Sequence, residues 1–213
     1  MKKIVYLIFS VLISVGLSGC SSHGKELLLD SFEGDLNHET VDYGSGGGAN
    51  LAVTAEKDLK FHGTQSIKLE YDMSEGGYLW AARGYNIDVK GAAKWEVPPE
   101  KIKWDKYNAF SVYMYGKNSK GKVAFDIKDS GFEIWRFMID DDFEGWKEIV
   151  MPFSEFFARA DWQPFNADRN SVRDFPIMTF QLEPRRPDKG VYLFDRVSLK
   201  KVKKTDEKVS SKE

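Results

Sequence analysis

The feature that most constrains the fold is a series of short segments in which apolar and polar residues alternate. Gly, Asn, Asp or Pro separates each segment from the next. The segments are 27–32, 50–55, 65–71, 78–85, 110–115, 122–128, 132–139, 146–151, 177–183 and 191–199. No stretch carries a sustained helical repeat, although 154–159 could form one helical turn. The pattern predicts an all-β fold, an antiparallel β-sandwich of the jelly-roll type with about ten strands.

Strand alternation also sorts the central side chains into two faces. The apolar set, Phe110, Val112, Met114, Phe125 and Phe180 among others, is predicted to form the core. The opposite, outer face is then expected to carry Tyr113, Tyr115, Asp126, Arg136, Gln181 and Glu183. Flat rings mixed with planar hydrogen-bonding groups suit a sugar-binding surface. An ordinary solvated sheet face is the alternative interpretation, and periodicity alone does not separate the two.

The first twenty residues have the pattern of a bacterial lipoprotein signal. Two lysines precede an apolar run, residues 4–16, which is shorter than the roughly 20 apolar residues that cross a bilayer. The run ends in Leu17-Ser18-Gly19-Cys20, which resembles a lipobox, where the cysteine is acylated and becomes the new N-terminus. An ordinary signal peptide that contains a cysteine is the alternative. We expect a signal over 1–19, a lipidated tether over 20–26 and, because Ser21 follows the cysteine, an outer-membrane address in the cell envelope.

Composition is consistent with one globular domain after this signal. Cys20 is the only cysteine, so the domain is predicted to contain no disulfide. Removing residues 1–19 takes away two of the 31 basic residues and none of the 33 acidic ones, which leaves a net charge of −4. This mildly acidic mixture offers no electrostatic footprint for nucleic acid, and we expect no such partner. The charged segment 201–213 is predicted to be a disordered tail, which leaves 27–200 as the domain.

Familiar catalytic and metal motifs are missing from the sequence. It contains no HExxH, GxSxG, GxGxxG or Walker-type loop, and its three histidines lack metal-ligand spacing. The segment 140–145 begins like a calcium loop, but Met151 stands where the last ligand would be a glutamate. Two glycosidase carboxylates cannot be placed at a catalytic separation from sequence. We therefore predict that the protein is not an enzyme.

Several segments resemble a carbohydrate-binding module of family 11. They are LLDSFEG at 28–34, GTQSIKL at 63–69, WKEIVMPFSEF at 146–156, RADWQP at 159–164 and FDRVSL at 194–199. The likeness spans nearly all of 27–199. The opening and closing segments are also similar to the family of mitochondrial complex I assembly factor 30, whereas the RADWQP segment is more specific to family 11.

The resemblance implies a galactose-binding-like jelly roll that is non-catalytic and binds β-glucans in a groove on its concave sheet. At matching positions it implies ligand contacts by Tyr43, Tyr78, Arg159, Asp161 and Trp162, the last standing where the family has a tyrosine. The rings would form a platform, and the Arg159–Asp161 pair would bond neighbouring hydroxyl groups. The alternative is that this pair only braces its loop.

The resemblance also implies a structural calcium where the first and last strands meet. Glu33 and Asp195 match ligand positions, and Asp30 is a weaker candidate. Ser31 stands where the family often has a second aspartate, so occupancy is left open at this point.

The function we predict is non-catalytic binding of a polysaccharide or oligosaccharide by a lipid-anchored envelope protein. The predicted ligand contacts are the five residues implied by the resemblance together with Tyr113, Asp126 and Arg136 from the outer sheet face. One alternative is an envelope assembly module whose same face docks a protein partner. Another is a carbohydrate-active enzyme on a jelly-roll scaffold, because fold resemblance alone does not decide function.

Overall fold

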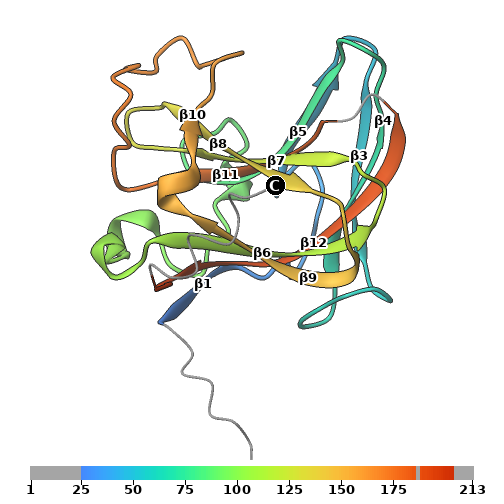
Figure 1. Cartoon of the computed structure of the whole chain (residues 1–213), viewed down its shortest axis with the longest axis horizontal. Coiled ribbons are helices and arrows are strands. Elements are labelled where there is room, and N and C mark those ends of the chain that lie inside the picture. The colour runs from blue at the N-terminus through green and yellow to red at the C-terminus, as the bar shows by residue number, and fades with distance from the viewer. Residues whose placement is uncertain (1–24, 186–187, 204–213) are drawn as a thin grey trace, which may run out of the picture.

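The structure, a computed structural model, describes residues 25–185 and 188–203, which form two antiparallel sheets packed face to face (Figure 1). Sheet A contains β1 (Glu26–Asp30), β3 (Asn50–Glu56), β4 (Ser66–Asp72), β6 (Ala109–Lys117), β9 (Glu144–Pro152) and β12 (Lys189–Lys200). Sheet B contains β2 (Asp42–Gly46), β5 (Tyr78–Gly84), β7 (Lys122–Lys128), β8 (Ile134–Asp140), β10 (Phe157–Ala158) and β11 (Thr179–Pro184). The predicted all-β antiparallel sandwich is confirmed.

The strand order joins segments that are far apart in the sequence. Sheet A runs β3-β4-β12-β6-β9, with β1 added along β12, and sheet B runs β10-β8-β7-β11-β5-β2. The pairs β4–β12 and β5–β11 each bring together residues about 100 or more positions apart. Both sheets therefore form only when distant parts of the chain meet.

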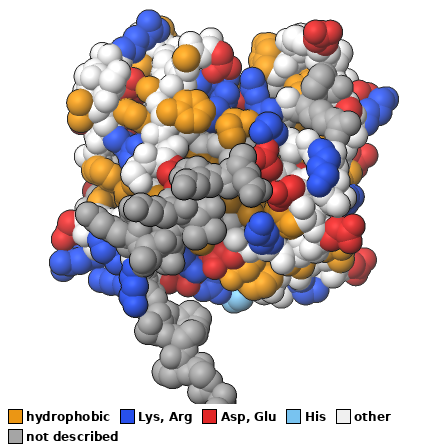
Figure 2. Space-filling view, viewed as in Figure 1, with side chains coloured by type: hydrophobic (Ala, Val, Ile, Leu, Met, Phe, Trp, Pro, Cys, Tyr) orange, Lys and Arg blue, Asp and Glu red, His pale blue; other side chains and the backbone are white. Residues whose placement is uncertain are grey.

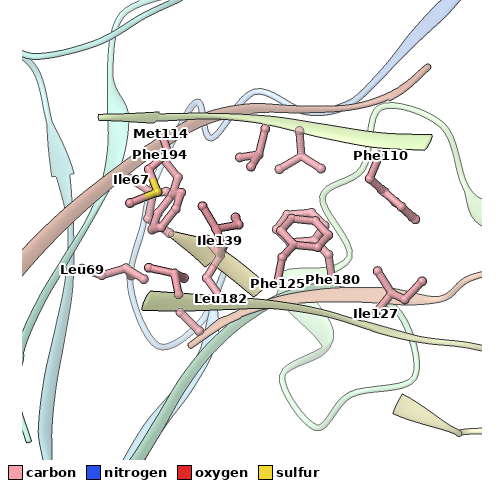
Figure 3. Close-up of a cluster of buried hydrophobic side chains, with 14 of the residues drawn as sticks. Ile67, Leu69, Phe110, Met114, Phe125, Ile127, Ile139, Phe180, Leu182 and Phe194 are labelled. Carbon is pink, nitrogen blue, oxygen red and sulfur yellow. The ribbon is translucent and has the colours of Figure 1, made fainter. Parts of the chain in front are cut away.

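The core lies between the sheets and contains the apolar sets expected from alternation. Phe110, Val112 and Met114 of β6 are fully buried, as are Phe125 of β7 and Phe180 of β11. The rings of Phe125 and Phe180 stack with centroids 5.8 Å apart, so they pack as neighbours on one sheet face. Side chains from the two sheets point toward one another across this space (Figure 3).

Two strands and most of the short helices were not expected from the sequence. Strand β2 has the sequence DYGSG, and its glycines weaken strand propensity. Its hydrogen-bonded pairing with β5 stabilises it as a strand. Strand β10 has only two residues. The expected turn near 154–159 is a 3-10 helix, η4 (Phe153–Glu155). Three more, η1 (Lys90–Ala92), η2 (Pro99–Lys101) and η3 (Trp104–Lys106), lie between β5 and β6.

The two ends of the domain are paired with each other. Glu26 of β1 lies opposite Lys200 of β12, and Val202 exchanges hydrogen bonds of 2.8 and 3.0 Å with the Asn108 side chain. The chain therefore still contacts the domain at Val202, beyond the predicted boundary at 200. The predicted signal, most of the tether and the rest of the tail lie outside the described residues. No helix in the described part of the chain is long and apolar enough to cross a membrane.

Candidate functional site

The outer face of sheet B forms the floor of a groove of about 930 Å³. Strands β2, β5, β7 and β11 contribute floor residues, and the loop after β10 contributes one wall. In the space-filling view this side is the upper edge of the molecule, which is notched and carries hydrophobic side chains beside the notch (Figure 2). The residues that carry the chemistry are Asp42, Tyr78, Trp80, Asp126, Lys128, Arg159, Asp161, Trp162, Phe165, Gln181 and Glu183.

Two aromatic rings form a flat shelf at one end of the groove. Tyr78 and Trp80 are two residues apart on β5, so both side chains point to the outer face. Their rings lie nearly parallel with centroids 6.2 Å apart. The register places Gly46 opposite Tyr78 and Gly44 opposite Trp80. A Cβ atom at Gly44 would lie 2.7 Å from Cη2 of Trp80, and one at Gly46 would clash with the Tyr78 ring. Gly44 and Gly46 therefore leave free the space over β2 that the two rings occupy.

A buried ion network lies beneath the centre of the groove. Arg136 donates to both carboxylate oxygens of Asp126 at 2.8 Å and to Glu183 at 2.7 Å. Arg159 donates to Glu183 at 2.7 Å, to Asp126 at 3.2 Å and, through Nε, to Asp161 at 2.9 Å. Gln181 also donates to Glu183. Each buried charge thus has partners of opposite sign, as burial requires.

This network shifts the pKa values of its members in opposite directions. Burial raises the pKa of Asp126 to about 6, with the Glu183 carboxylate adding to the rise and Arg136 opposing it. Partial burial would raise the pKa of Asp161, but its bonds to Arg159 outweigh this, and the pKa is lowered. Asp161 is half exposed on its side chain, and so is the network member best placed to meet a ligand.

The wall of the groove is held by side-chain bonds to a neighbouring strand. Gln163 accepts from the Ile134 backbone N–H at 2.7 Å and donates to the carbonyl oxygens of Ile134 and Arg159. These bonds fix the turn that carries Trp162, which is 56 % exposed and lies against the Arg159 guanidinium, 5.6 Å from it. Phe165, three residues further on, is 98 % exposed at the rim.

The groove therefore offers two kinds of contact to a ligand. Exposed flat rings stand at both ends, and charged or amide groups held in fixed positions lie between them. Rings can stack on the C–H face of a cyclic ligand, and the polar groups can donate to or accept from its hydroxyls.

The family model described as a carbohydrate-binding domain of family 11 matches residues 19–199. The chain belongs to carbohydrate-binding module family 11. The modules of this family bind carbohydrate and are non-catalytic, and this membership supports glycan binding by the domain.

Solved structures agree with this family in fold. The chain is similar to the family 11 module from Clostridium thermocellum in complex with a β-1,3-1,4-mixed-linked tetrasaccharide, with TM-score 0.64, 24% identity, and 85% of this chain and 98% of that one covered. The family 11 module of the cellulase Lic26A-Cel5E of the same organism gives TM-score 0.63 at 22% identity, covering 85% and 97%. A β-1,2-glucanase from Parabacteroides distasonis gives TM-score 0.52 at 12% identity, with 85% of this chain and 26% of that chain covered. No curated protein matches the sequence.

Five of the predicted ligand residues meet in the groove of this family 11 module. They are Tyr78, Asp126, Arg159, Asp161 and Trp162. Arg136 lies directly beneath, only 5 % exposed, and does not line the groove. It acts on the site through Asp126 and Glu183, because both carboxylates are bonded to it.

Two predicted ligand residues lie elsewhere. Tyr43 alternates with Asp42 and Gly44 along β2, so it points to the inner face, packs against the core and stacks on His38 with centroids 3.9 Å apart. Tyr113 belongs to β6 in sheet A, and its ring stacks on Phe61 at 3.5 Å. Its predicted grouping with Asp126 on one sheet face was wrong, because adjacent strands in sequence, β6 and β7, enter different sheets.

Trp80, Asp42 and Lys128 also line the groove and were not among the predicted ligand residues. Trp80 donates from Nε1 to Asp42 at 3.3 Å, which keeps the indole flat over β2. The available signal was its spacing from Tyr78, since residues two apart on a strand share a face. The spacing alone could not place Trp80 in the groove, because this also depends on β2 lying beside β5 with glycines that leave room for the ring.

The three predicted calcium ligands separate into two groups. Asp30 is buried and bonded by both oxygens to Arg83, at 2.9 and 3.1 Å, so its carboxylate already has a cationic partner, and a calcium ligand at this position stays a prediction. Glu33 and Asp195 both hold the loop 57–65, Glu33 through Thr64 and Asp195 through the N–H groups of residues 61 and 62. Oδ1 of Asp195 is buried without a hydrogen-bond partner, an arrangement that fits a cation. Within 25–185 and 188–203, no group of three or more acidic, His or Cys residues could hold a metal ion.

The raised pKa of Asp126 predicts how stability changes with pH. Its folded pKa of about 6 lies above the unfolded value of about 3.9, so the folded state binds more protons between these pH values. The contribution of this carboxyl to the free energy of unfolding therefore falls as pH rises through about 6. In Asp126→Asn that contribution is absent. From pH 4.5 to 7.5 the free energy of unfolding of the wild type should therefore fall relative to that of the variant, by on the order of 2 kcal/mol.

Urea unfolding of both proteins at several pH values measures this difference. Asp140→Asn, at an exposed carboxyl of β8, is the control and should follow the wild type across the range. A constant difference between wild type and Asp126→Asn at every pH would contradict the assignment.

Proposed function

We propose that this protein is a lipid-anchored envelope protein whose sheet B groove binds a β-glucan-like polysaccharide without cleaving it. The observation that carries the proposal is the pairing of the Tyr78–Trp80 shelf with the wall residues Arg159, Asp161 and Trp162 across one groove. A pyranose chain presents flat C–H faces and rows of hydroxyls, which match this order of rings and polar groups. The solved relative with a bound mixed-linkage tetrasaccharide suggests the first ligand to test.

The two buried carboxylates of the groove are bonded to arginines, which favours a structural role for them over a catalytic one. A glycosidase needs one carboxylic acid that can protonate a leaving group and a second free carboxylate. Asp126 and Glu183 are the two buried carboxylates of the groove, and arginine guanidinium groups occupy both. These carboxylates hold the groove in shape, and we propose no catalytic role for them.

Removing the exposed rings should weaken glycan binding without unfolding the domain. We expect Tyr78→Ala, Trp80→Ala and Trp162→Ala each to raise the Kd for a mixed-linkage β-glucan oligosaccharide by about tenfold, because one lost stacking contact costs on the order of 1 kcal/mol or more. Calorimetry and affinity electrophoresis on the soluble domain measure this. Phe61→Ala is the matched control, since that ring is 44 % exposed but belongs to the β3–β4 loop and stacks on Tyr113 of sheet A.

Four outcomes separate the hypotheses. Loss of binding in the three groove variants alone supports the groove as the site. Unchanged binding in all of them overturns the site assignment. A broad glycan screen without any ligand, together with one stoichiometric protein partner, would favour the assembly module, and release of reducing sugar would favour an enzyme.

The lipid anchor is proposed from the sequence at 17–20. In a bacterial host fed a labelled fatty acid, the full chain should carry the label, and Cys20→Ala should not. Fractionation of the outer and inner membranes of a two-membrane host tests the outer-membrane address. A label that persists in Cys20→Ala would contradict acylation at this residue.

We further propose that Glu33 and Asp195 hold a structural calcium ion, with backbone and water oxygens as the remaining ligands. A bound cation would neutralise these carboxylates and would stabilise the folded state by binding to it alone. Calcium should therefore raise the Tm of the domain by several degrees over a chelator-treated sample, and Asp195→Asn should remove that difference. Glu70→Gln, at an exposed acid of β4, should retain it. An equal Tm with and without calcium in the wild type would refute the site.

A further inference from the structure

The outer face of sheet A, opposite the groove, carries a second group of aromatic rings. This aromatic patch consists of Phe61, Tyr113, Tyr115 and Trp146. Phe61 stacks on Tyr113 with centroids 3.5 Å apart and lies 6.2 Å from Trp146, which meets Tyr115 edge-on at 5.5 Å. Phe61 and the neighbouring Leu59 are each 44 % exposed. Grouped, partly exposed rings on a sheet face indicate a contact surface.

The patch lies on the same side of the molecule as the start of the domain. The loop 57–65 folds over sheet A because Phe61 and His62 donate their N–H groups to Asp195 at 2.9 and 2.8 Å. The next residue, Arg196, donates to Glu26 at the start of β1, at 3.1 Å. Figure 1 shows the start of β1 and the β3–β4 loop both extending below sheet A, away from sheet B.

The proposed anchor limits how far this side can be from a membrane. Four residues separate Cys20 from Lys25, so the Cα atoms of these two residues lie no more than about 18 Å apart even if the chain is fully extended. A folded protein partner or a thick polysaccharide would have to enter that narrow gap to reach the patch. A lipid surface is the partner that the short tether itself supplies.

The charges around the patch suit an anionic lipid surface. Lys25, Lys60, Lys201 and Lys203 are exposed on this side, and Lys201 is bonded to Lys25 through the backbone. Among the nearby acids, Glu26 and Glu148 are paired with Lys200, and Glu26 also with Arg196, so they oppose the lysines less. Glu56, which accepts from the backbone N–H groups of Asp58 and Leu59, and the exposed Asp58 lie beside the patch and reduce the attraction of the lysines for anionic lipid. Trp and Tyr favour the headgroup region of a bilayer, and each lysine close to anionic lipid adds attraction.

We propose that the outer face of sheet A rests on the membrane, with Leu59, Phe61 and Trp146 at the level of the lipid headgroups. This inference rests on the proposed lipid anchor. It implies a fixed orientation, in which the groove on sheet B points away from the membrane toward glycan in the surrounding space.

The orientation can be measured on the full lipidated chain in vesicles of phosphatidylethanolamine and phosphatidylglycerol. Leu59→Cys and Val172→Cys each receive a fluorescent label, since the sulfur of an acylated Cys20 does not react. Val172 is the matched control, because it is 59 % exposed in the loop that precedes β11 on the sheet B side. A nitroxide quencher carried on lipid should quench the label at position 59 at least twofold more than the label at 172.

A second variant tests the role of the patch itself. Adding Phe61→Ser and Lys60→Glu to the Leu59→Cys chain should lower quenching to the level seen at position 172, with the fold checked by circular dichroism. Equal quenching at 59 and 172 in chains that float with the vesicles would overturn the proposed orientation while leaving the anchor intact. Chains that do not float would overturn the anchor and the orientation together, while glycan binding by the soluble domain would be unaffected.

Discussion

The site depends first on the pairing of Arg136 with two carboxylates beneath the groove. Asp126 and Glu183 lie on adjacent strands of sheet B and are almost fully buried, and without a cation between them they would repel each other in a poorly solvated place. Arg136 bonds to both, and Arg159 then reaches the same carboxylates from the wall loop. The loop that carries the exposed Trp162 ring is thereby tied to the floor by ion pairs, in addition to the hydrogen bonds of Gln163 to Ile134.

The end of the groove formed by Tyr78 and Trp80 depends on the absence of side chains beneath the rings rather than on charge. A ring lies flat on a strand only if the strand beneath has no side chains there, and Gly44 and Gly46 leave that space free for Trp80 and Tyr78. The same glycines make β2 a poor strand on its own, so it depends on β5 for its order. An aromatic shelf on glycine and a charged wall with one exposed ring together give one sheet face the contacts that the proposed ligand, flat and rich in hydroxyls, would need.

The two outer faces of the sandwich carry different surfaces, so the two sides of the molecule are not equivalent. Sheet B presents the groove, whereas sheet A presents the aromatic patch beside the residues from which the chain leads back to Cys20. A family 11 module with a short tether would therefore not turn freely. Its sandwich would separate the lipid surface from the glycan by the thickness of two sheets, about 10 Å between them and their outer side chains beyond.

The sequence alone determined the elements whose signals are local. Alternation places Phe125 and Phe180 inside because a strand turns every second side chain the same way, and Arg159, Asp161 and Trp162 lie together because they share one short loop. Only the tertiary structure decided which strands are neighbours. In that structure Tyr113 lies on the other sheet, Tyr43 packs against the core and Trp80 lines the groove. Strand order and register arise from pairings between distant segments, and a shift of one residue exchanges the two faces of a strand, so no local pattern could have fixed them.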